Sequence, residues 1–140
     1  MKRKRYTPPE KPHELDILKM LTGPEQYEVI TDAMLGEEGD AFIEIIDRVY
    51  AAWECMPKTY DTADQGREAI AHLHFFVGAC DWWIVEKDAD PDHAGQVQAF
   101  GIADLGMGRE LGYISIPELL ENGAELDLYF KPQPIGELLA

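Results

Sequence analysis

The sequence is poor in cysteine, in basic residues and in long apolar runs. Cys55 and Cys80 are the two cysteines among 140 residues, and their spacing forms neither a metal-binding cluster nor a disulfide framework. We therefore expect reduced, buried thiols, as is usual in cytoplasmic proteins. No apolar run approaches the roughly 20 residues of a membrane helix, and no apolar segment follows the basic start as it would in a secretory signal. These absences predict a cytoplasmic protein without a membrane span.

Basic residues are scarce and unevenly placed. The chain has 12 Lys and Arg residues against 27 Asp and Glu residues, which gives a formal net charge of -15, and five of the 12 basic residues lie within the first 11 positions. The remaining body should repel nucleic acid, which proteins bind mainly through Lys and Arg on phosphate. It should instead attract a protein with a basic surface. The alternative is that the acidity serves solubility alone.

The basic start also carries three prolines, Pro8, Pro9 and Pro12. Because proline lacks a backbone donor and like charges repel, residues 1–13 are predicted to form a mobile arm. The other interpretation of this arm is a contact with nucleic acid. Residues 14–140 are long enough for a single domain with its own core, with a helical part at 14–55 and a sheet part at 71–132.

Apolar residues recur at helical spacing in the first third of the chain. Their spacing over residues 15–21 predicts a short helix, and Pro24 suits the first turn of a second helix that stops at Gly36. A third helix begins at Gly39 or Asp40 and ends before Pro57, with an apolar stripe that comprises Phe42, Ile46, Val49 and Trp53. Such stripes are typical of core packing.

From residue 71 the apolar period changes to two, which is typical of β-strands. The expected strands are residues 71–77, 82–87, 96–104, 111–116 and 126–130, with a short helix from Pro117 before the last strand. Short connections favour antiparallel pairing. The prediction is an α+β fold, in which three N-terminal helices pack on one face of an antiparallel β-sheet of about five strands.

The second half of the chain contains, in this order, the segments HFF, DWWIVEKD, FGIADLG, ELGYISIPEL and ELDLYFKP. Together they resemble an uncharacterised family, the domain of unknown function 2958, over about residues 55–132. Members of that family occur in bacteriophages, plasmids and integrative elements. The resemblance therefore implies a small accessory protein of a mobile element in the cytoplasm of a bacterial host. It implies no activity, cofactor or catalytic residue.

Two histidines at i and i+2, His72 and His74, are expected to project together from one face of the first strand. Such a pair can chelate zinc if further ligands are supplied, and Asp81, Glu86, Asp88 or Asp104 could supply one. Asp81 is the one taken with the two histidines as the candidate site. This arrangement would suit a small metal-dependent hydrolase. The alternative is two polar aromatic residues on an outer sheet face, with no metal and no cofactor.

Other patterns are weaker. Cys80 near the two histidines could form a Cys–His pair, although no oxyanion-hole pattern accompanies it. The start of a calcium loop is mimicked by Asp88, Asp90, Asp92 and His93, but the glycine and the closing glutamate of such a loop are not in the required positions. Gly106-Met107-Gly108 is too short for a phosphate cradle and leads into a strand.

The remaining candidate is a surface on the sheet face that the helices leave uncovered. Aromatic residues with a polar group, rimmed by acidic residues, are typical of protein interfaces. The residues expected there are His72, His74, Trp82 or Trp83, Tyr113, Asp127 and Tyr129. A helix or a second subunit could cover this face instead, and the second case would make the protein a homodimer.

Charge and resemblance together predict a non-enzymatic, acidic protein-binding accessory protein. Its expected partner is a host protein with a basic surface, such as a nucleic-acid-binding defence complex that it would inhibit in the manner of an anti-CRISPR or anti-restriction protein. The acidic body is not expected to bind nucleic acid or a membrane. A metal-dependent hydrolase centred on His72, His74 and Asp81, and an assembly factor of the mobile element, are the alternatives.

Overall fold

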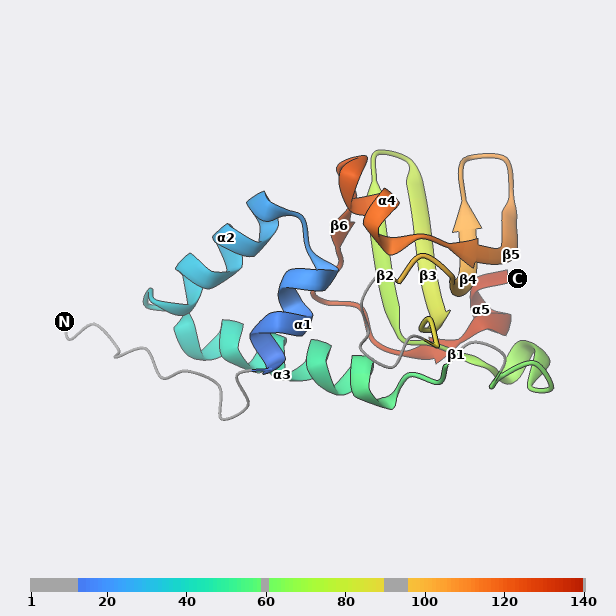
Figure 1. Cartoon of the computed structure of the whole chain (residues 1–140), viewed down its shortest axis with the longest axis horizontal. Coiled ribbons are helices and arrows are strands. Elements are labelled where there is room, and N and C mark those ends of the chain that lie inside the picture. Colours follow the sequence, from blue (N-terminus) through green and yellow to red (C-terminus); the bar gives the residue numbers. More distant parts are fainter. Residues whose placement is uncertain (1–12, 59–60, 90–95, 140) are drawn as a thin grey trace.

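The computed structural model describes residues 13–58, 61–89 and 96–139 and has an α+β architecture, as predicted (Figure 1). The helices are α1 (His13–Leu21), α2 (Pro24–Met34), α3 (Gly39–Cys55), α4 (Ile116–Glu121) and α5 (Ile135–Leu139), with a 3-10 turn η1 at Gly66–Glu68. The strands of the main sheet are β2 (Leu73–Val77), β3 (Cys80–Glu86), β4 (Ala99–Asp104), β5 (Arg109–Ile114) and β6 (Glu125–Leu126). Two short strands, β1 (Ile70–Ala71) and β7 (Gln133–Pro134), form a separate pair.

The main sheet is antiparallel throughout, with the strand order β5-β4-β3-β2-β6. The β2–β3 and β4–β5 hairpins turn at the same end of the sheet (Figure 1). Gly78, in the β2–β3 turn, has a φ of 55°, a conformation that glycine adopts without strain. This two-residue turn fixes the register, so that Phe76 lies opposite Asp81 and His74 lies opposite Trp83.

One face of the sheet packs on the N-terminal helices and α4. Phe75 and Ile84 from the sheet share a buried cluster with Leu21 of α1, Trp53 of α3 and Ile116 of α4. The apolar stripe of α3 faces this cluster, as its period predicts. Burial of the large apolar side chains from all these elements stabilises the association of the helical part with the sheet.

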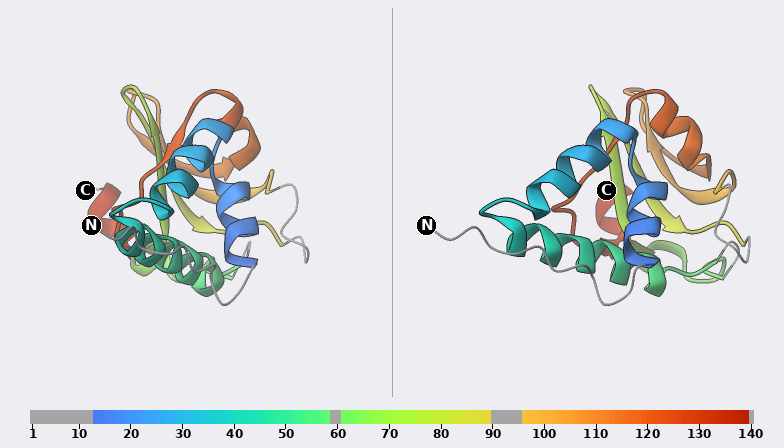
Figure 2. Two further views of the ribbon diagram at one scale, coloured as in Figure 1. Left: turned by 90° about the vertical axis from the view of Figure 1, so that its left-hand side faces the viewer. Right: turned by 60° about the vertical axis from the view of Figure 1, so that its left-hand side comes forward.

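The opposite face is also covered, by a helix, which is one of the alternatives that the sequence left open. Trp83, Val85 and Ile102 of the sheet form a second buried cluster with Ile135 and Leu138 of α5. In the left view of Figure 2, α5 lies on one side of the sheet and α1 and α4 lie on the other. The prediction missed α5, because five residues are too few to show a helical period.

Two predicted strands are shorter than expected for identifiable reasons, and a third is interrupted. The last strand ends at Leu126 because the side chain of Asp127 accepts a hydrogen bond from the backbone N–H of Tyr129 at 3.0 Å, which turns the chain. The strand expected at 96–104 begins at Ala99, since Gln96 has a φ of 34°, outside the β region. The strand expected at 71–77 is broken at His72, between β1 and β2.

Buried polar side chains tie the polar connection after α3 to β3. Glu86 accepts hydrogen bonds from the backbone N–H and the hydroxyl of Thr62, at 2.7 and 2.5 Å. The Lys87 ammonium donates to the carbonyl of Trp53 at 2.9 Å and lies 5.0 Å from the centroid of the Trp53 indole. Burial lowers the pKa of Lys87, and the Lys58 charge also lowers it, while the nearby Glu54 charge acts in the opposite direction.

Candidate functional site

His74 lies where three separate parts of the chain meet. Its Nδ1 is 2.9 Å from a carboxylate oxygen of Asp127, and its Nε2 is 2.8 Å from a carboxylate oxygen of Asp81. The ring stacks on Trp83 with a centroid distance of 5.0 Å and also contacts Phe130 at 5.7 Å. His74 thereby links β2 to β3 and to the segment that follows β6.

This arrangement suits a structural link better than a catalytic base. Both contacts are hydrogen bonds at the same time when each ring nitrogen carries a hydrogen, because an ionised carboxylate can only accept. With both nitrogens engaged by carboxylates, neither is left to take a proton from a substrate. His74 instead holds the carboxylates of Asp81 in β3 and Asp127 after β6 in place, and both acidic side chains are partly exposed.

A row of aligned residues crosses all five strands at the hairpin end of the sheet. Residues directly opposite each other in antiparallel strands share a face, and the register gives the order Glu125, Phe76, Asp81, Asp104 and Arg109. Three of the five are acidic, and Phe76 between them is 36% exposed. The row therefore presents carboxylates around an accessible aromatic ring.

Asp104 is held in its ionised form within this row. The backbone N–H of Gly106 donates to its carboxylate at 2.9 Å and lowers the pKa of Asp104, and the Arg109 guanidinium, at 3.2 Å, lowers it further. Arg109 also lies over the Trp83 ring, 4.6 Å from its centroid. The one basic residue of the row is thus engaged by Asp104 and Trp83.

Tyr129 extends the acidic area beyond the sheet. It is 70% exposed and lines a hollow of about 380 Å³ together with Glu125 and residues of α2. Asp127 adjoins the row through its shared partner His74. We call the combined set the acidic end surface, defined by Phe76, Asp81, Asp104, Glu125, Asp127 and Tyr129.

The structure brings together part of the predicted surface and separates the rest. His74 contacts Asp127, and Asp127 accepts a hydrogen bond from the backbone N–H of Tyr129, so these three lie together. Trp83 is only 6% exposed and belongs to the core under α5, so it cannot serve as a docking residue. Trp82 points to the opposite face and packs against the helical core, because neighbouring residues of a strand alternate between faces.

Tyr113 and His72 lie apart from the acidic end surface. Tyr113 is exposed on the edge strand β5, where its ring makes an edge-to-face contact with Phe100 at 5.8 Å. In β5 it lies four residues from Arg109, which is the β5 member of the row that crosses the sheet. His72 lines a different hollow, between α3 and residues 127–132.

The metal-binding alternative gains no support from the geometry. Across the part of the chain that the structure describes, no group of three or more His, Cys, Asp and Glu side chains is placed to hold a metal ion. His74 and Asp81 are in contact, but His72 does not complete a ligand set with them. Residues 90–95 of the acidic turn, and the arm at 1–12, lie outside the described residues.

The two cysteines are free, as predicted, but they are less buried than expected. Cys55 is exposed at the end of α3, and Cys80 is partly exposed at the start of β3. Cys80 lies opposite Val77 in the sheet rather than beside the His74 ring nitrogens, which are engaged by carboxylates. The predicted Cys–His pair therefore has no free imidazole nitrogen at His74.

Four members of the acidic end surface were absent from the predicted surface: Phe76, Asp81, Asp104 and Glu125. Asp81 was considered only as a metal ligand. The sequence did contain a signal for the position of Phe76. A two-residue turn centred on Gly78 places Phe76 opposite Asp81, whatever covers the sheet. Glu125 had no comparable signal, because its strand is two residues long and pairs with a distant strand.

Among the described residues, no helix combines the length and apolar character needed to cross a membrane.

The comparisons with known proteins agree with the resemblance in the sequence. Neither the curated proteins nor the solved structures contain a match to this chain. A family model, described as "Protein of unknown function (DUF2958)", matches residues 51–134, which include the whole main sheet and the acidic end surface. The chain therefore belongs to the DUF2958 family.

Proposed function

We propose that this protein is a non-enzymatic accessory protein that binds a basic surface of another protein through its acidic end surface. The observation that carries the proposal is the row in which Glu125 and Asp81 flank the exposed Phe76, with Asp104 on the next strand beyond Asp81. An accessible aromatic group supplies apolar contact area, and the surrounding carboxylates supply charge complementarity to Lys and Arg.

The state of the carboxylates also supports this proposal. His74 holds the carboxylates of Asp81 and Asp127, and Arg109 holds the carboxylate of Asp104. Because these side chains are already oriented in the free protein, they lose little conformational freedom on binding. The net charge of -15 would steer a basic partner towards the protein over a longer range, to an extent that falls as salt rises.

We further propose that the partner is a nucleic-acid-binding defence complex of a bacterial host. A groove that holds nucleic acid is lined with Lys and Arg, so its charge is complementary to the acidic end surface. The family resemblance adds the context of phages and mobile elements. Occupation of such a groove would block access of nucleic acid, which is how an anti-CRISPR or anti-restriction protein can act without chemistry.

A binding experiment with matched variants tests the proposal. The tagged protein is used to capture partners from bacterial lysate at low salt, and the dissociation constant for the purified partner is then measured by titration calorimetry. We expect Glu125→Lys/Tyr129→Ser to weaken binding at least about tenfold. The control Leu35→Ser/Glu37→Lys makes the same kinds of change at exposed positions between α2 and α3, and should bind as the unchanged protein does.

Two results would contradict the proposal. The first is failure of the unchanged protein to capture any basic partner at about 50 mM salt, where the electrostatic attraction is least screened. The second is an equal loss of binding in the control variant, which would mean that net charge alone, and not the acidic end surface, is recognised.

A further inference from the structure

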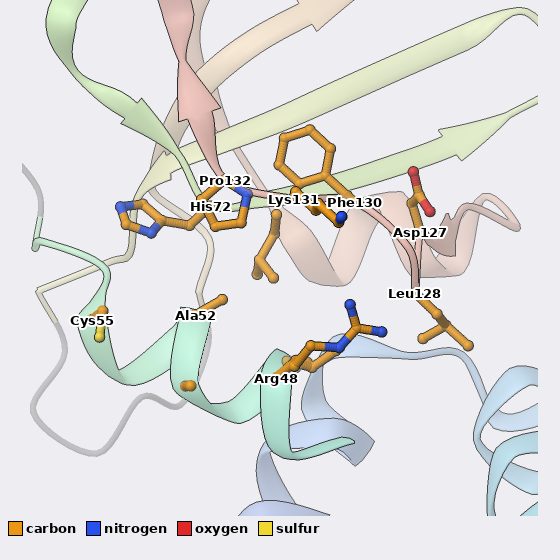
Figure 3. Close-up of a pocket in the computed structure, with 12 residues that line it drawn as sticks. Arg48, Ala52, Cys55, His72, Asp127, Leu128, Phe130, Lys131 and Pro132 are labelled. Carbon is orange, nitrogen blue, oxygen red and sulfur yellow. The ribbon is translucent and has the colours of Figure 1, made fainter. Parts of the chain in front are cut away.

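A separate hollow of about 360 Å³ lies between the C-terminal half of α3 and the segment that joins β6 to β7. Its volume is in the range of small-molecule binding pockets. The walls are largely apolar, and they are formed by Val49, Ala52, Leu73, Leu128, Phe130 and Pro132. Figure 3 shows these walls, with α3 on one side and the segment that carries Asp127, Phe130 and Lys131 on the other.

Two basic side chains line this pocket from opposite walls. Arg48 extends from α3 towards the segment that contains Lys131 (Figure 3). Neither Arg48 nor Lys131 has a hydrogen bond or an ion pair with any residue that the structure describes. Because acidic residues outnumber basic ones by more than two to one in this chain, two unpaired cations at one hollow are a local reversal of the overall charge.

Other hollows of the described structure differ in this respect. Three further ones, of about 310, 380 and 380 Å³, are lined by no Lys or Arg and contain one to three acidic residues each. Among these four hollows of the described residues, only the pocket beside α3 is lined by basic side chains, so its positive charge does not follow from the lining of hollows by polar residues in general.

The lining keeps one net positive charge when Asp127 is included, because two basic side chains stand against one acidic one. Asp127 is the one acidic residue in its lining, and both of its carboxylate oxygens are already engaged, by His74 and by the backbone N–H of Tyr129. Burial, and to a lesser degree the charge of Lys87, lowers the pKa of His72. The neutral imidazole of His72 can still donate a hydrogen bond to a carboxylate.

We propose that this pocket binds a small monocarboxylic acid with an apolar body, and that its carboxylate lies between Arg48 and Lys131. The apolar body would pack on Ala52, Leu73 and Phe130, where burial of the chain supplies most of the affinity. The guanidinium and the ammonium fix the orientation through charge-assisted hydrogen bonds. This inference does not rest on the proposed function, because the pocket shares only Asp127 with the acidic end surface and uses none of the residues in the row across the five strands.

Calorimetric titration of the full chain with decanoate tests the inference. We expect saturable binding of one equivalent, and at least about tenfold weaker binding of decylammonium, which has a similar apolar chain but the opposite charge. Arg48→Gln/Lys131→Gln should weaken decanoate binding by about tenfold or more. Both side chains are exposed, so thermal unfolding should show that the variant remains folded.

Two matched variants complete the experiment. Lys19→Gln/Lys58→Gln removes the same charge at exposed positions outside the pocket, and decanoate binding should remain unchanged. Ala51→Phe places a large ring in the pocket from its exposed wall, and should abolish binding of decanoate. Absence of saturable decanoate binding up to about 1 mM, equal binding of decylammonium, or an equal loss in the Lys19/Lys58 variant would each overturn the inference.

Discussion

Gln26 forms two hydrogen bonds with the backbone of Leu126, a residue 100 positions later in the chain. Its amide nitrogen donates to the carbonyl of Leu126 at 2.8 Å, and its amide oxygen accepts from the Leu126 N–H at 2.9 Å. The side chain of α2 thus takes the place of a further strand beside β6, where the sheet would otherwise have an open edge. One glutamine therefore joins the helical part of the molecule to the sheet.

Gln26→Leu should lower the free energy of unfolding by about 1–3 kcal/mol, because a side chain of similar size would leave the N–H and C=O of the buried Leu126 unpaired. Urea denaturation followed by circular dichroism measures the change. Glu28→Leu, at an exposed position of the same helix, is the control and should change stability by less than about 0.5 kcal/mol. Equal stability of both variants would show that the paired hydrogen bonds contribute little.

Gly101 and Gly112 lie directly opposite each other in β4 and β5, yet they should respond very differently to substitution. A Cβ at Gly101 would lie 1.8 Å from the carbonyl oxygen of Trp83, whereas a Cβ at Gly112 has no atom within 4 Å. Gly101→Ala should therefore destabilise the protein by about 3 kcal/mol or more, since the backbone has to move. Gly112→Ala should be close to neutral in the same urea titration, and similar losses in both variants would contradict this account.

Helix α5 should contribute strongly to stability despite its five residues. Ile135 and Leu138 are buried against Trp83 and Val85, so Leu138→Ala should cost about 2–5 kcal/mol through lost burial and the cavity left behind. Glu137→Ala, on the exposed side of the same helix, should have almost no effect. Thermal unfolding and the rate of limited proteolysis measure both variants. If the Leu138→Ala protein were as stable as the Glu137→Ala protein, burial of the sheet face beneath α5 would contribute little to the free energy of unfolding.

His72 should make the protein less stable as the pH falls. Burial and the Lys87 charge lower the pKa of His72 in the folded state, so below about pH 6.5 the unfolded chain binds a proton that the folded chain does not. The free energy of unfolding should therefore rise with pH between the lowered folded pKa and about 6.5, with a slope of at most about 1.4 kcal/mol per pH unit from this residue.

His72→Gln should remove that part of the slope. Urea denaturation at several pH values from about 5 to 8 makes the comparison, and the stability difference between the two proteins should grow in favour of the variant as the pH decreases. The other charged groups around His72, namely Arg48, Lys131 and Asp127 of the pocket, are present in both proteins. A constant stability difference across this pH range would contradict the assignment.

Local patterns predicted the fold class and the position of most elements. The two-residue alternation from Leu73 to Val77 and the stripe of α3 both appear in the structure, because each reflects one buried face. The alternation from Leu126 to Phe130 failed as a strand, since the Asp127 side chain captures the N–H of Tyr129 and turns the chain. A local hydrogen bond of this kind is invisible to a periodicity argument.

The candidate site was harder to predict than the fold. Alternation places Trp82 and Trp83 on opposite faces, but it cannot say which face the helices will cover. It also cannot show that α5 closes the second face over Trp83, which depends on packing between segments some 50 residues apart. The acidic end surface depends on the register across five strands, and only the β2–β3 part of that register is set by a tight turn.

The burial of Trp83 beneath α5 has a practical consequence for spectroscopy. Trp53 lies in the helical core and Trp83 in the core under α5, so the two indoles are fluorophores on opposite sides of one sheet. In variants that retain a single tryptophan, the emission wavelength would therefore report the hydration of one side at a time. The chain carries its own optical probes for deciding whether its two layers melt together or in sequence.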